Sequence, residues 1–463
     1  MPRSELCSTT GVVKFIRKFL LRGIQKWGLG NQKTKILISE TVRFRFYFLL
    51  EFSQKWRYCE RRENKNMYDN IIAQKVAKQY KQNPLTDFAC VNYKTKIEEL
   101  NLNWRERDLP EIERTKHVHR LHPYMGKFIP QLVEIFLRKY QPKLVYDPFC
   151  GSGTTLVEAN SLGIDSIGTD ISVFNTLLSK VKTAKYDIRF LEKEIKDILK
   201  RFYVYKSKFS NDEKVNKLFT TQNEYIKAWF APNTQKELLC YLRLIKDYTH
   251  QDLLKIVLSR SARSARLVTH YDLDFPKKPQ TTPYYCYKHG RICKPVGEAY
   301  KFLSRYTIDT LERIKEFSKL RTNAKVIVNH ADSRNVKLPK GIDMVFTSPP
   351  YIGLIDYHDQ HRYAYELLGL QNNETKEIGP AKNGQSDRAK KDYIDGINTV
   401  LLHTRDYMVK NGLALIVIND KYGLYKPETV GFKSIGRIDR HVNRRTGRRD
   451  TPFYESILIW QKI

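Results

Sequence analysis

The sequence predicts an α/β fold with a Rossmann-like sheet and a large, mainly helical, basic insertion. Short apolar segments alternate with helical periodicity from about residue 117 onward. A glycine-rich turn joins one of these segments to a helix, as in a ligand-binding strand-turn-helix unit. A stretch rich in lysine, arginine and tyrosine, about 186–320, then interrupts the alternation before it resumes. Such alternation is typical of a parallel sheet covered by helices.

The first half of the sheet is expected from residues 128–170. A helix is predicted near 128–139, then an apolar strand at 143–146 and a helix beginning near Thr154. Gly163 stands where a helix C-cap glycine is expected, and a second short strand follows at 165–170.

Three later apolar segments predict the rest of the sheet, at 325–328, 342–346 and 413–418. The sequence therefore divides into four parts. These are a basic segment 1–66, a first part of the catalytic domain 67–185, the insertion 186–320, and a second part of the domain 321–463. Helical periodicity begins just after Met67, so the segment before it is expected to be dispensable.

The charge of the chain predicts a polyanionic partner. Lys and Arg total 82 against 50 Asp and Glu, which gives a formal net charge of +32. Charge on this scale opposes the compact state unless a partner such as nucleic acid neutralises it. No apolar run approaches the roughly 20 residues that span a bilayer, so no membrane partner is expected. The 7 scattered cysteines favour reduced thiols and a cytoplasmic location.

Residues 147–154 form the expected cofactor loop. Gly151 and Gly153 permit positive φ and close approach of a ligand to the backbone. Asp170 follows about 20 residues later, where a ribose hydroxyl would be bound. A dinucleotide or nucleoside triphosphate site is disfavoured, because Leu156 replaces the third glycine and no loop lysine follows.

The second candidate segment is Ser348-Pro349-Pro350-Tyr351, which follows an apolar strand. Two prolines lack N–H donors, so strand pairing ends there and the preceding carbonyls face whatever lies beyond the sheet. The amine of a nucleobase is a poor nucleophile, and acceptors aimed at its hydrogens favour a pyramidal nitrogen. We expect Ser348 Oγ and the Pro349 carbonyl to supply them, and Tyr351 to stack on an extruded base.

These two segments resemble the motifs of the S-adenosylmethionine-dependent DNA amino-methyltransferases, namely Asp-Pro-Phe-x-Gly-Ser-Gly-Thr and Asp/Asn/Ser-Pro-Pro-Tyr/Phe/Trp. Residues 122–132 resemble the family's segment upstream of the loop, and Asp332 falls where the family often holds the cofactor's adenine amine. The resemblance implies a class I methyltransferase sheet, double-stranded DNA as substrate and a restriction endonuclease as partner. The cofactor-binding residues it implies are Lys127, Asp147, Pro148, Phe149, Gly151, Gly153, Thr154, Asp170 and Asp332.

The serine of the tetrapeptide favours N4 of cytosine, since this form is usual among the cytosine-N4 members of the family. N6 of adenine remains an alternative, followed by an RNA base amine. Carbon-5 methylation is disfavoured because no Pro-Cys dipeptide is present to supply its nucleophile. A basic DNA-binding scaffold without activity is a further alternative.

Two basic stretches are expected to contact DNA. Arg260, Arg263 and Arg266 recur at helical spacing within the insertion, with a solvated helix face as an equal alternative. Residues 437–449 are expected to form a basic turn between two strands and to bind phosphate, and the residues singled out there are Arg440, Arg444 and Arg445.

Two other clusters are less informative. Residues 356–362 follow the tetrapeptide on an expected helix and either line the base pocket or contact phosphate. His289 lies between Cys286 and Cys293, but a Cys-x-x-Cys pair is missing and a fourth ligand would have to come from elsewhere. No metal site is therefore predicted.

Overall fold

The computed structural model describes residues 72–76, 78, 84–209, 212–274, 276–442 and 453–463. Segment 1–66, together with Arg444 and Arg445, lies outside the described residues. The predictions made for them therefore stay predictions.

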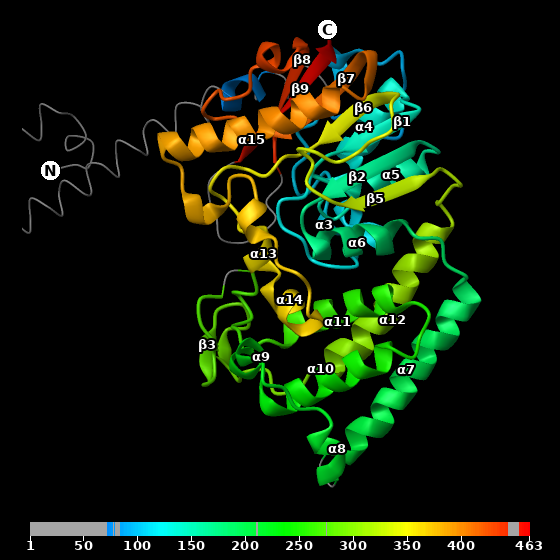
Figure 1. Ribbon diagram of the computed structural model, residues 1–463, viewed down its shortest axis with the longest axis vertical. Coiled ribbons are helices and arrows are strands. Elements are labelled where there is room, and N and C mark those ends of the chain that lie inside the picture. Colours follow the sequence, from blue (N-terminus) through cyan, green and yellow to red (C-terminus); the bar gives the residue numbers. More distant parts are fainter. Residues whose placement is uncertain (1–71, 77, 79–83, 210–211, 275, 443–452) are drawn as a thin grey trace, which may run out of the picture. The chain divides into compact units, whose positions relative to one another are not determined.

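A seven-stranded sheet forms the frame of the described chain (Figure 1). Its strands lie in the order β5-β2-β1-β6-β7-β9-β8, and the first five of these are mutually parallel. β9 runs antiparallel to both β7 and β8. The strands are β1 (Leu144–Asp147), β2 (Asp165–Asp170), β5 (Val326–His330), β6 (Ile342–Thr347), β7 (Met408–Ile418), β8 (Phe432–His441) and β9 (Tyr454–Lys462).

This strand order is that of a doubly wound sheet extended by an antiparallel pair. From β1 the chain adds β2 and β5 on one side, and it then returns to place β6 and β7 on the other. The order reverses between β1 and β6, which pair directly through Val145 and Met344. The Rossmann-like class I methyltransferase sheet predicted from the sequence is confirmed, and its switch point lies between these two strands.

Helices cover both faces of the sheet. On one face, α4 packs Leu132 and Phe136 against the apolar side chains of β1, β6, β7 and β9. On the other face, α15 packs Ile397 and Leu401 against the same strands. Burial on both sides explains why the central strands are continuous apolar runs, as in other parallel sheets. The helices of this part are α3 (Glu111–Arg114), α4 (Pro130–Tyr140), α5 (Thr154–Ser161), α6 (Val173–Thr183), α13 (Tyr357–Gln360), α14 (Arg362–Leu368) and α15 (Asp387–Arg405), with 3-10 helices η2 (Ile97–Glu99), η3 (His117–Arg120), η4 (Glu374–Lys376), η5 (Ala381–Asn383) and η6 (Pro427–Val430).

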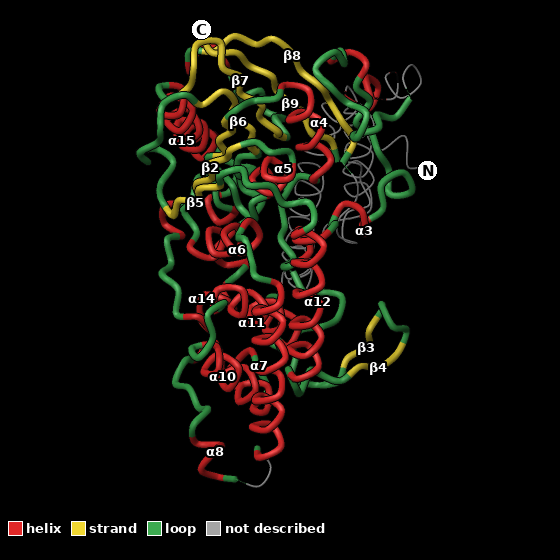
Figure 2. Tube along the Cα trace, turned by 90° about the vertical axis from the view of Figure 1, so that its right-hand side faces the viewer, coloured by secondary structure: helices red, strands yellow, loops and turns green. Residues whose placement is uncertain are grey.

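The insertion between β2 and β5 is mainly helical, as expected. Its elements are α7 (Ile188–Lys208), α8 (Glu213–Lys217), α9 (Glu224–Trp229), α10 (Pro232–Ile245), α11 (Gln251–Ala265), β3 (Tyr284–Cys286), β4 (Arg291–Cys293) and α12 (Tyr300–Ser318). β3 and β4 form a two-stranded hairpin that projects beside the helices (Figure 2).

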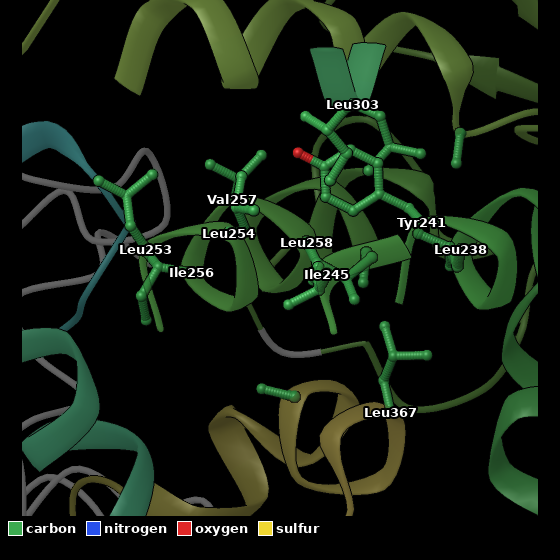
Figure 3. Packing of buried hydrophobic residues seen from close by; sticks show 14 of the residues in the cluster. Leu238, Tyr241, Ile245, Leu253, Leu254, Ile256, Val257, Leu258, Leu303 and Leu367 are labelled. Atoms are coloured by element: carbon green, nitrogen blue, oxygen red, sulfur yellow. The ribbon is translucent and has the colours of Figure 1, made fainter. Parts of the chain in front are cut away.

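The apolar core of the insertion continues into the α/β part. α11 contributes a row of buried residues that contacts α10, α12 and α14 (Figure 3). Phe174 and Leu178 of α6 and Leu367 of α14 belong to the same cluster. The insertion therefore shares one core with the helix that follows β2.

Two boundaries differ from expectation for local reasons. α4 begins at Pro130, because proline is suited to the first helical turn and the residue before it is driven to an extended conformation. β7 begins at Met408, before the apolar run at 413–418, although Lys410 and Asn411 are polar. Asn411 adopts φ of 60° in the part of β7 where the pairing with β6 is irregular. Among the described residues, no helix is long and apolar enough to cross a bilayer.

We expect Leu254→Ala to lower the free energy of unfolding by about 2–5 kcal/mol, because Leu254 is fully buried in the shared cluster and its removal leaves a cavity. Urea denaturation followed by circular dichroism measures the change. Leu218→Ala is the matched control, since Leu218 is 53% exposed in the same insertion, and it should stay within about 0.5 kcal/mol. A similar effect of both changes would contradict the shared core.

Candidate active site

The candidate site lies at the carboxyl ends of β1 and β6, where the strand order reverses. Loops after these strands and after β2 and β5 surround one cavity, which is where open α/β sheets bind ligands. Nine residues singled out from the sequence line it, namely Lys127, Pro148, Phe149, Gly151, Thr154, Asp170, Asp332, Ser348 and Pro350. Segments about 200 residues apart in sequence are thus brought to a single place.

The loop after β1 is shaped by two glycines with positive φ, Gly151 at 50° and Gly153 at 77°. A Cβ on Gly153 would lie 2.8 Å from Ser179 Oγ, so glycine is required for α6 to pack against the loop. Ser179 Oγ in turn donates a 2.9 Å hydrogen bond to the Gly151 carbonyl. α6 therefore fixes the loop from behind, while Gly151 faces the cavity.

Lys182 provides a second connection from α6 to the loop. Its side chain is fully buried, and Nζ donates to the Ser152 carbonyl at 2.8 Å. Burial, with a further contribution from Lys127, lowers the pKa of Lys182 well below its usual value. Lys182 was not predicted as a site residue, because a single lysine at the end of an amphipathic helix gives no indication of burial.

Asp170 lies at the end of β2 with its carboxylate held in place. Oδ2 accepts from the Gly151 amide at 2.9 Å, and Oδ1 accepts from the Ser172 amide at 2.8 Å and from Asn175 Nδ2 at 3.1 Å. Burial raises the pKa of Asp170, and these hydrogen bonds oppose that shift. The carboxylate is preorganised at the edge of the cavity.

The structure places Asp147 beneath the loop and not at the surface of the cavity. This residue was expected to bind cofactor, but its side chain is 1% exposed and is not part of the cavity lining. The carboxylate accepts from Thr155 Oγ1 at 2.7 Å, from Thr347 Oγ1 at 2.6 Å and from the Phe149 amide at 3.1 Å. Burial raises its pKa to about 6. Asp147 supports the loop from beneath, and Gly153, also expected at the ligand, likewise lies behind the lining.

Several polar atoms of the cavity lining are buried without a hydrogen-bond partner among the described residues. These are Ser152 Oγ, Thr154 Oγ1 and Asn175 Oδ1. Buried polar groups in proteins are normally paired, so atoms of this kind in a cavity point to a polar ligand. Lys127 lies nearby and donates from Nζ to the His119 carbonyl at 2.9 Å.

Asp332, which follows β5, also lines the cavity. Its carboxylate is held by Arg334 through Nε–Oδ1 at 2.9 Å and Nη2–Oδ2 at 2.6 Å. Burial alone would raise the pKa of Asp332, but the hydrogen bonds from Arg334 bring it below its usual value. The carboxylate therefore stays ionised and fixed in orientation.

The tetrapeptide follows β6 and adjoins the loop of β1. Ser348 and Pro350 line the cavity, and the Pro350 carbonyl accepts from Tyr393 Oη at 3.0 Å. Tyr351 Oη donates to Glu455 Oε1 at 2.9 Å, and its ring stacks on Phe453 with centroids 6.3 Å apart. Burial and the Glu455 carboxylate raise the pKa of Tyr351.

Aromatic residues close the remaining side of the cavity. Tyr124 and Tyr357 stack with ring centroids 6.3 Å apart, and Tyr124 Oη accepts from Asn175 Nδ2 at 3.1 Å. Tyr124 belongs to the segment 122–132 before the loop, but it was not predicted as a site residue. Tyr357, on α13, shows that part of the 356–362 cluster does line this cavity.

The arginines expected to contact DNA in the insertion are largely internal, and the structure does not bring them together on an exposed surface. Arg260 is 8% exposed and pairs with Asp309 at 2.6 Å, while Arg266 is 4% exposed, stacks over the Tyr363 ring and donates to the Leu273 carbonyl at 2.6 Å. Arg263 is half-buried and pairs with Asp274. Two acids of the insertion and the Tyr363 ring of α14 already engage these guanidinium groups.

Arg440 is likewise internal, on β8, with 1% of its side chain exposed. Its Nε lies 3.7 Å from Glu455 Oε2, so Arg440 and Tyr351 share the same carboxylate. Rather than lying on a phosphate-binding surface, Arg440 stands behind the tetrapeptide. The expected strands on both sides of the basic turn are confirmed as β8 and β9.

A switch-point cavity bounded by a glycine-rich loop, an acid after the second strand and a Ser-Pro-Pro-Tyr segment after the fourth defines a class I methyltransferase. Residues 32–180 match the N6/N4 DNA methylase family. The Type II methyltransferase M.MjaII of Methanocaldococcus jannaschii is 40% identical over 429 residues, which cover 75% of this chain and 81% of the relative. The chain therefore belongs to the N6/N4 DNA methyltransferase family of restriction-modification type, and its methyl donor is S-adenosylmethionine.

More distant relatives carry the same description. M.MvaI of Kocuria varians is 28% identical over 252 residues, covering 50% of this chain and 53% of the relative. M.BsoBI of Geobacillus stearothermophilus is 25% identical over 302 residues, covering 59% and 57%. Among solved structures, the rRNA methyltransferase aviRa from Streptomyces viridochromogenes covers 80% of this chain and 96% of its own at 11% identity, and its TM-score of 0.29 is too low to bear on the fold.

We expect Gly153→Ala to weaken S-adenosylmethionine binding by about tenfold or more, because an added Cβ at positive φ must displace Ser179 or the loop. Isothermal titration calorimetry measures the dissociation constant. Gly163→Ala is the matched control, since Gly163 has a similar φ of +75° but nothing lies within 4 Å of its added Cβ. Equal weakening by both substitutions would show that strain alone, rather than the contact with α6, sets the affinity.

We expect Lys182→Met to remove the contribution of this lysine to the pH dependence of the free energy of unfolding. Unfolded lysine is protonated below 10.5, whereas buried Lys182 has a lowered pKa, so the unfolded chain binds more protons and stability rises with pH. As the pH rises toward 10.5, the stability of the wild type should increase relative to that of the variant by at most about 1.4 kcal/mol for each pH unit.

Urea denaturation across that range measures the gain. Lys180→Met, an exposed position on the same helix, should show no such trend relative to the wild type. A constant stability difference between wild type and Lys182→Met at every pH would contradict the buried neutral amine.

Proposed function

We propose that this chain methylates the N4 amine of cytosine within a specific sequence of double-stranded DNA. The observation that carries the proposal is Ser348, which begins the Ser-Pro-Pro-Tyr segment and lines the same cavity as Gly151 and Asp170. Serine at this position is usual among the cytosine-N4 members of the family that the motifs resemble. N6 of adenine is the second candidate, because acceptors in this arrangement serve either amine. An RNA base amine is a weaker alternative.

The cavity offers matching groups for each part of the cofactor. Asp170 is proposed to accept the ribose hydroxyls, and Asp332 with Phe149 to bind the adenine ring. The unpartnered Ser152 Oγ and Thr154 Oγ1, with Lys127, are proposed to hold the amino-acid end. When bound, S-adenosylmethionine supplies an electrophilic methyl group.

The tetrapeptide is proposed to act on the target amine. Ser348 Oγ and the Pro349 carbonyl accept its two hydrogens, which favours a nitrogen lone pair directed at the methyl group. The Pro350 carbonyl is already bonded to Tyr393, so the turn keeps its shape while the base enters. Tyr351 stacks on a base taken out of the duplex, with its hydroxyl bonded to Glu455. Glu455 was not singled out from the sequence and is proposed as a positioning residue.

Recognition of the DNA sequence is proposed for the helical insertion, about 186–320. Since Arg260 and Arg266 are used internally, the phosphate contacts fall to other basic residues of the insertion and to Arg444 and Arg445. The family's restriction-modification type further favours a cognate endonuclease that cleaves the same unmethylated sequence. Segment 1–66 is proposed to be dispensable for catalysis.

We expect Ser348→Ala to lower methyl transfer to duplex DNA by about 100-fold or more while leaving S-adenosylmethionine affinity within about twofold, because an acceptor to the amine is lost rather than a cofactor contact. Tritium transfer from labelled cofactor measures turnover, and calorimetry measures binding. Ser318→Ala, an exposed serine on α12, is the matched control.

The base is identified in the same experiment by nucleoside mass spectrometry of the methylated DNA. N4-methylcytosine supports the proposal, whereas N6-methyladenine establishes the second candidate. Full activity of Ser348→Ala would refute the assigned chemistry for either base.

A further inference from the structure

Four metal-ligand side chains meet in the insertion, away from the cavity at the sheet. They are His270, shortly after α11, Cys286 at the end of β3, His289 in the hairpin turn and Cys293 at the end of β4. One ligand atom from each lies within 4.8 Å of all the others. Both cysteines are buried and unbonded to each other, and neither contributes to the proposed methyl transfer.

The distances between these atoms fit the edges of a tetrahedron around one metal ion. Nδ1 of His289 lies 3.4 Å from Cys293 Sγ and 3.6 Å from Cys286 Sγ, and Nδ1 of His270 lies 3.8 Å from Cys286 Sγ. A tetrahedral zinc with Zn–S of about 2.3 Å and Zn–N of about 2.0–2.1 Å has ligand-to-ligand edges of about 3.3–3.8 Å. Three of the six edges therefore already have coordination lengths, and the other three are at most 4.8 Å.

A tight turn in the hairpin brings two of the four side chains together. The amides of His289 and Gly290 both donate to the Cys286 carbonyl, at 3.0 and 2.8 Å, and Gly290 adopts φ of +61°. This tight turn places Cys286 and His289 side by side in a Cys-x-x-His arrangement, which has the spacing of the usual Cys-x-x-Cys pair. The fourth ligand is His270, which lies 16 residues before Cys286. This separation gives no indication in the sequence that the two side chains are neighbours.

The hairpin contains little else that would hold it together. Its two strands have three residues each, and Tyr285, Tyr287 and Ile292 are 50%, 78% and 64% exposed. A two-stranded hairpin of this size is marginal in water unless it is packed or cross-linked. The buried residues of the two strands are the two cysteines themselves.

A second cluster of possible ligands does not have this character. His117, His119 and Glu158 lie close together, but the Glu158 carboxylate is taken by Lys116 at 3.1 Å and by His119 at 2.7 Å. A lysine ammonium occupies the position of a cation there. By contrast, the contacts of the hairpin cluster are those among its own sulfur and nitrogen atoms.

We propose that His270, Cys286, His289 and Cys293 form a structural site for one tetrahedral Zn²⁺ ion, which revises the expectation that the chain binds no metal. With four protein ligands the coordination shell is closed, so the ion takes no part in methyl transfer. It ties the hairpin to the end of α11 and holds the exposed tyrosines beside it in place.

Metal analysis of the full-length protein, expressed in zinc-containing medium and exchanged into metal-free buffer, tests the site. We expect about one zinc per chain by plasma mass spectrometry. Cys286→Ser, Cys293→Ser and the exposed His289→Ala should each reduce that content at least about tenfold, since a tetrahedral site rarely tolerates the loss of a ligand. Cys90→Ser, at an exposed thiol far along the chain, is the control and should retain the metal.

Cobalt substitution of the wild type gives a readout that does not depend on the variants folding. Reduced, chelator-treated protein titrated with Co²⁺ should develop the visible absorption of tetrahedral cobalt and a thiolate charge-transfer band at one equivalent, and Zn²⁺ should displace both. Zinc-free protein that also fails to give this spectrum would overturn the proposal and leave a hydrogen-bonded thiol-imidazole cluster. Zinc retained in all three ligand variants would place the metal elsewhere and overturn it equally.

Discussion

The buried carboxylate of Asp147 is the interaction on which the active site depends. It accepts hydrogen bonds from Thr155 at the start of α5, from Thr347 at the end of β6 and from the backbone of the loop itself. A buried charge without such partners costs several kcal/mol, so the loss of any of the three donors would destabilise the buried carboxylate. The result is that the loop after β1 and the tetrapeptide after β6 are fixed relative to each other by one side chain. The cavity between them follows from that constraint.

Most of the sheet was predictable because its signals are local. Apolar runs such as that of β6 end at turns whose residues allow only a few backbone conformations. The glycine-rich loop likewise predicts a strand before it and a helix after it. The cofactor cavity was largely predictable for the same reason, since Gly151, Thr154 and Asp170 belong to contiguous motifs. What the motifs do not distinguish is a residue that touches a ligand from one that supports the loop. Asp147 and Gly153 belong to the motif, but neither is part of the cavity lining.

The residues that sequence reasoning misjudged are those whose partners lie far along the chain. Spacing places Arg260, Arg263 and Arg266 along a helix, but it does not show that Asp309 and Asp274 face two of them. Arg440 belongs to a dense basic run, yet its neighbour across the sheet is Glu455, whose other oxygen holds Tyr351. For the same reason, the sequence did not predict that His270 lies beside the two cysteines of the hairpin. In each case the missing information is tertiary, because burial and pairing are set by elements that the sequence separates.

α6 contacts both the core of the insertion and the loop after β1. Phe174 and Leu178 on one side of this helix are part of the core of the insertion, while Ser179 and Lys182 hold the carbonyls of the loop after β1. Close-packed cores transmit strain rather than absorb it. Under the proposed role of the insertion in DNA recognition, a displacement of its helices on a duplex would reach the loop after β1 through α6, and thermodynamic linkage would make that influence mutual. The insertion and the loop after β1 are thus connected through one shared helix rather than through a flexible joint.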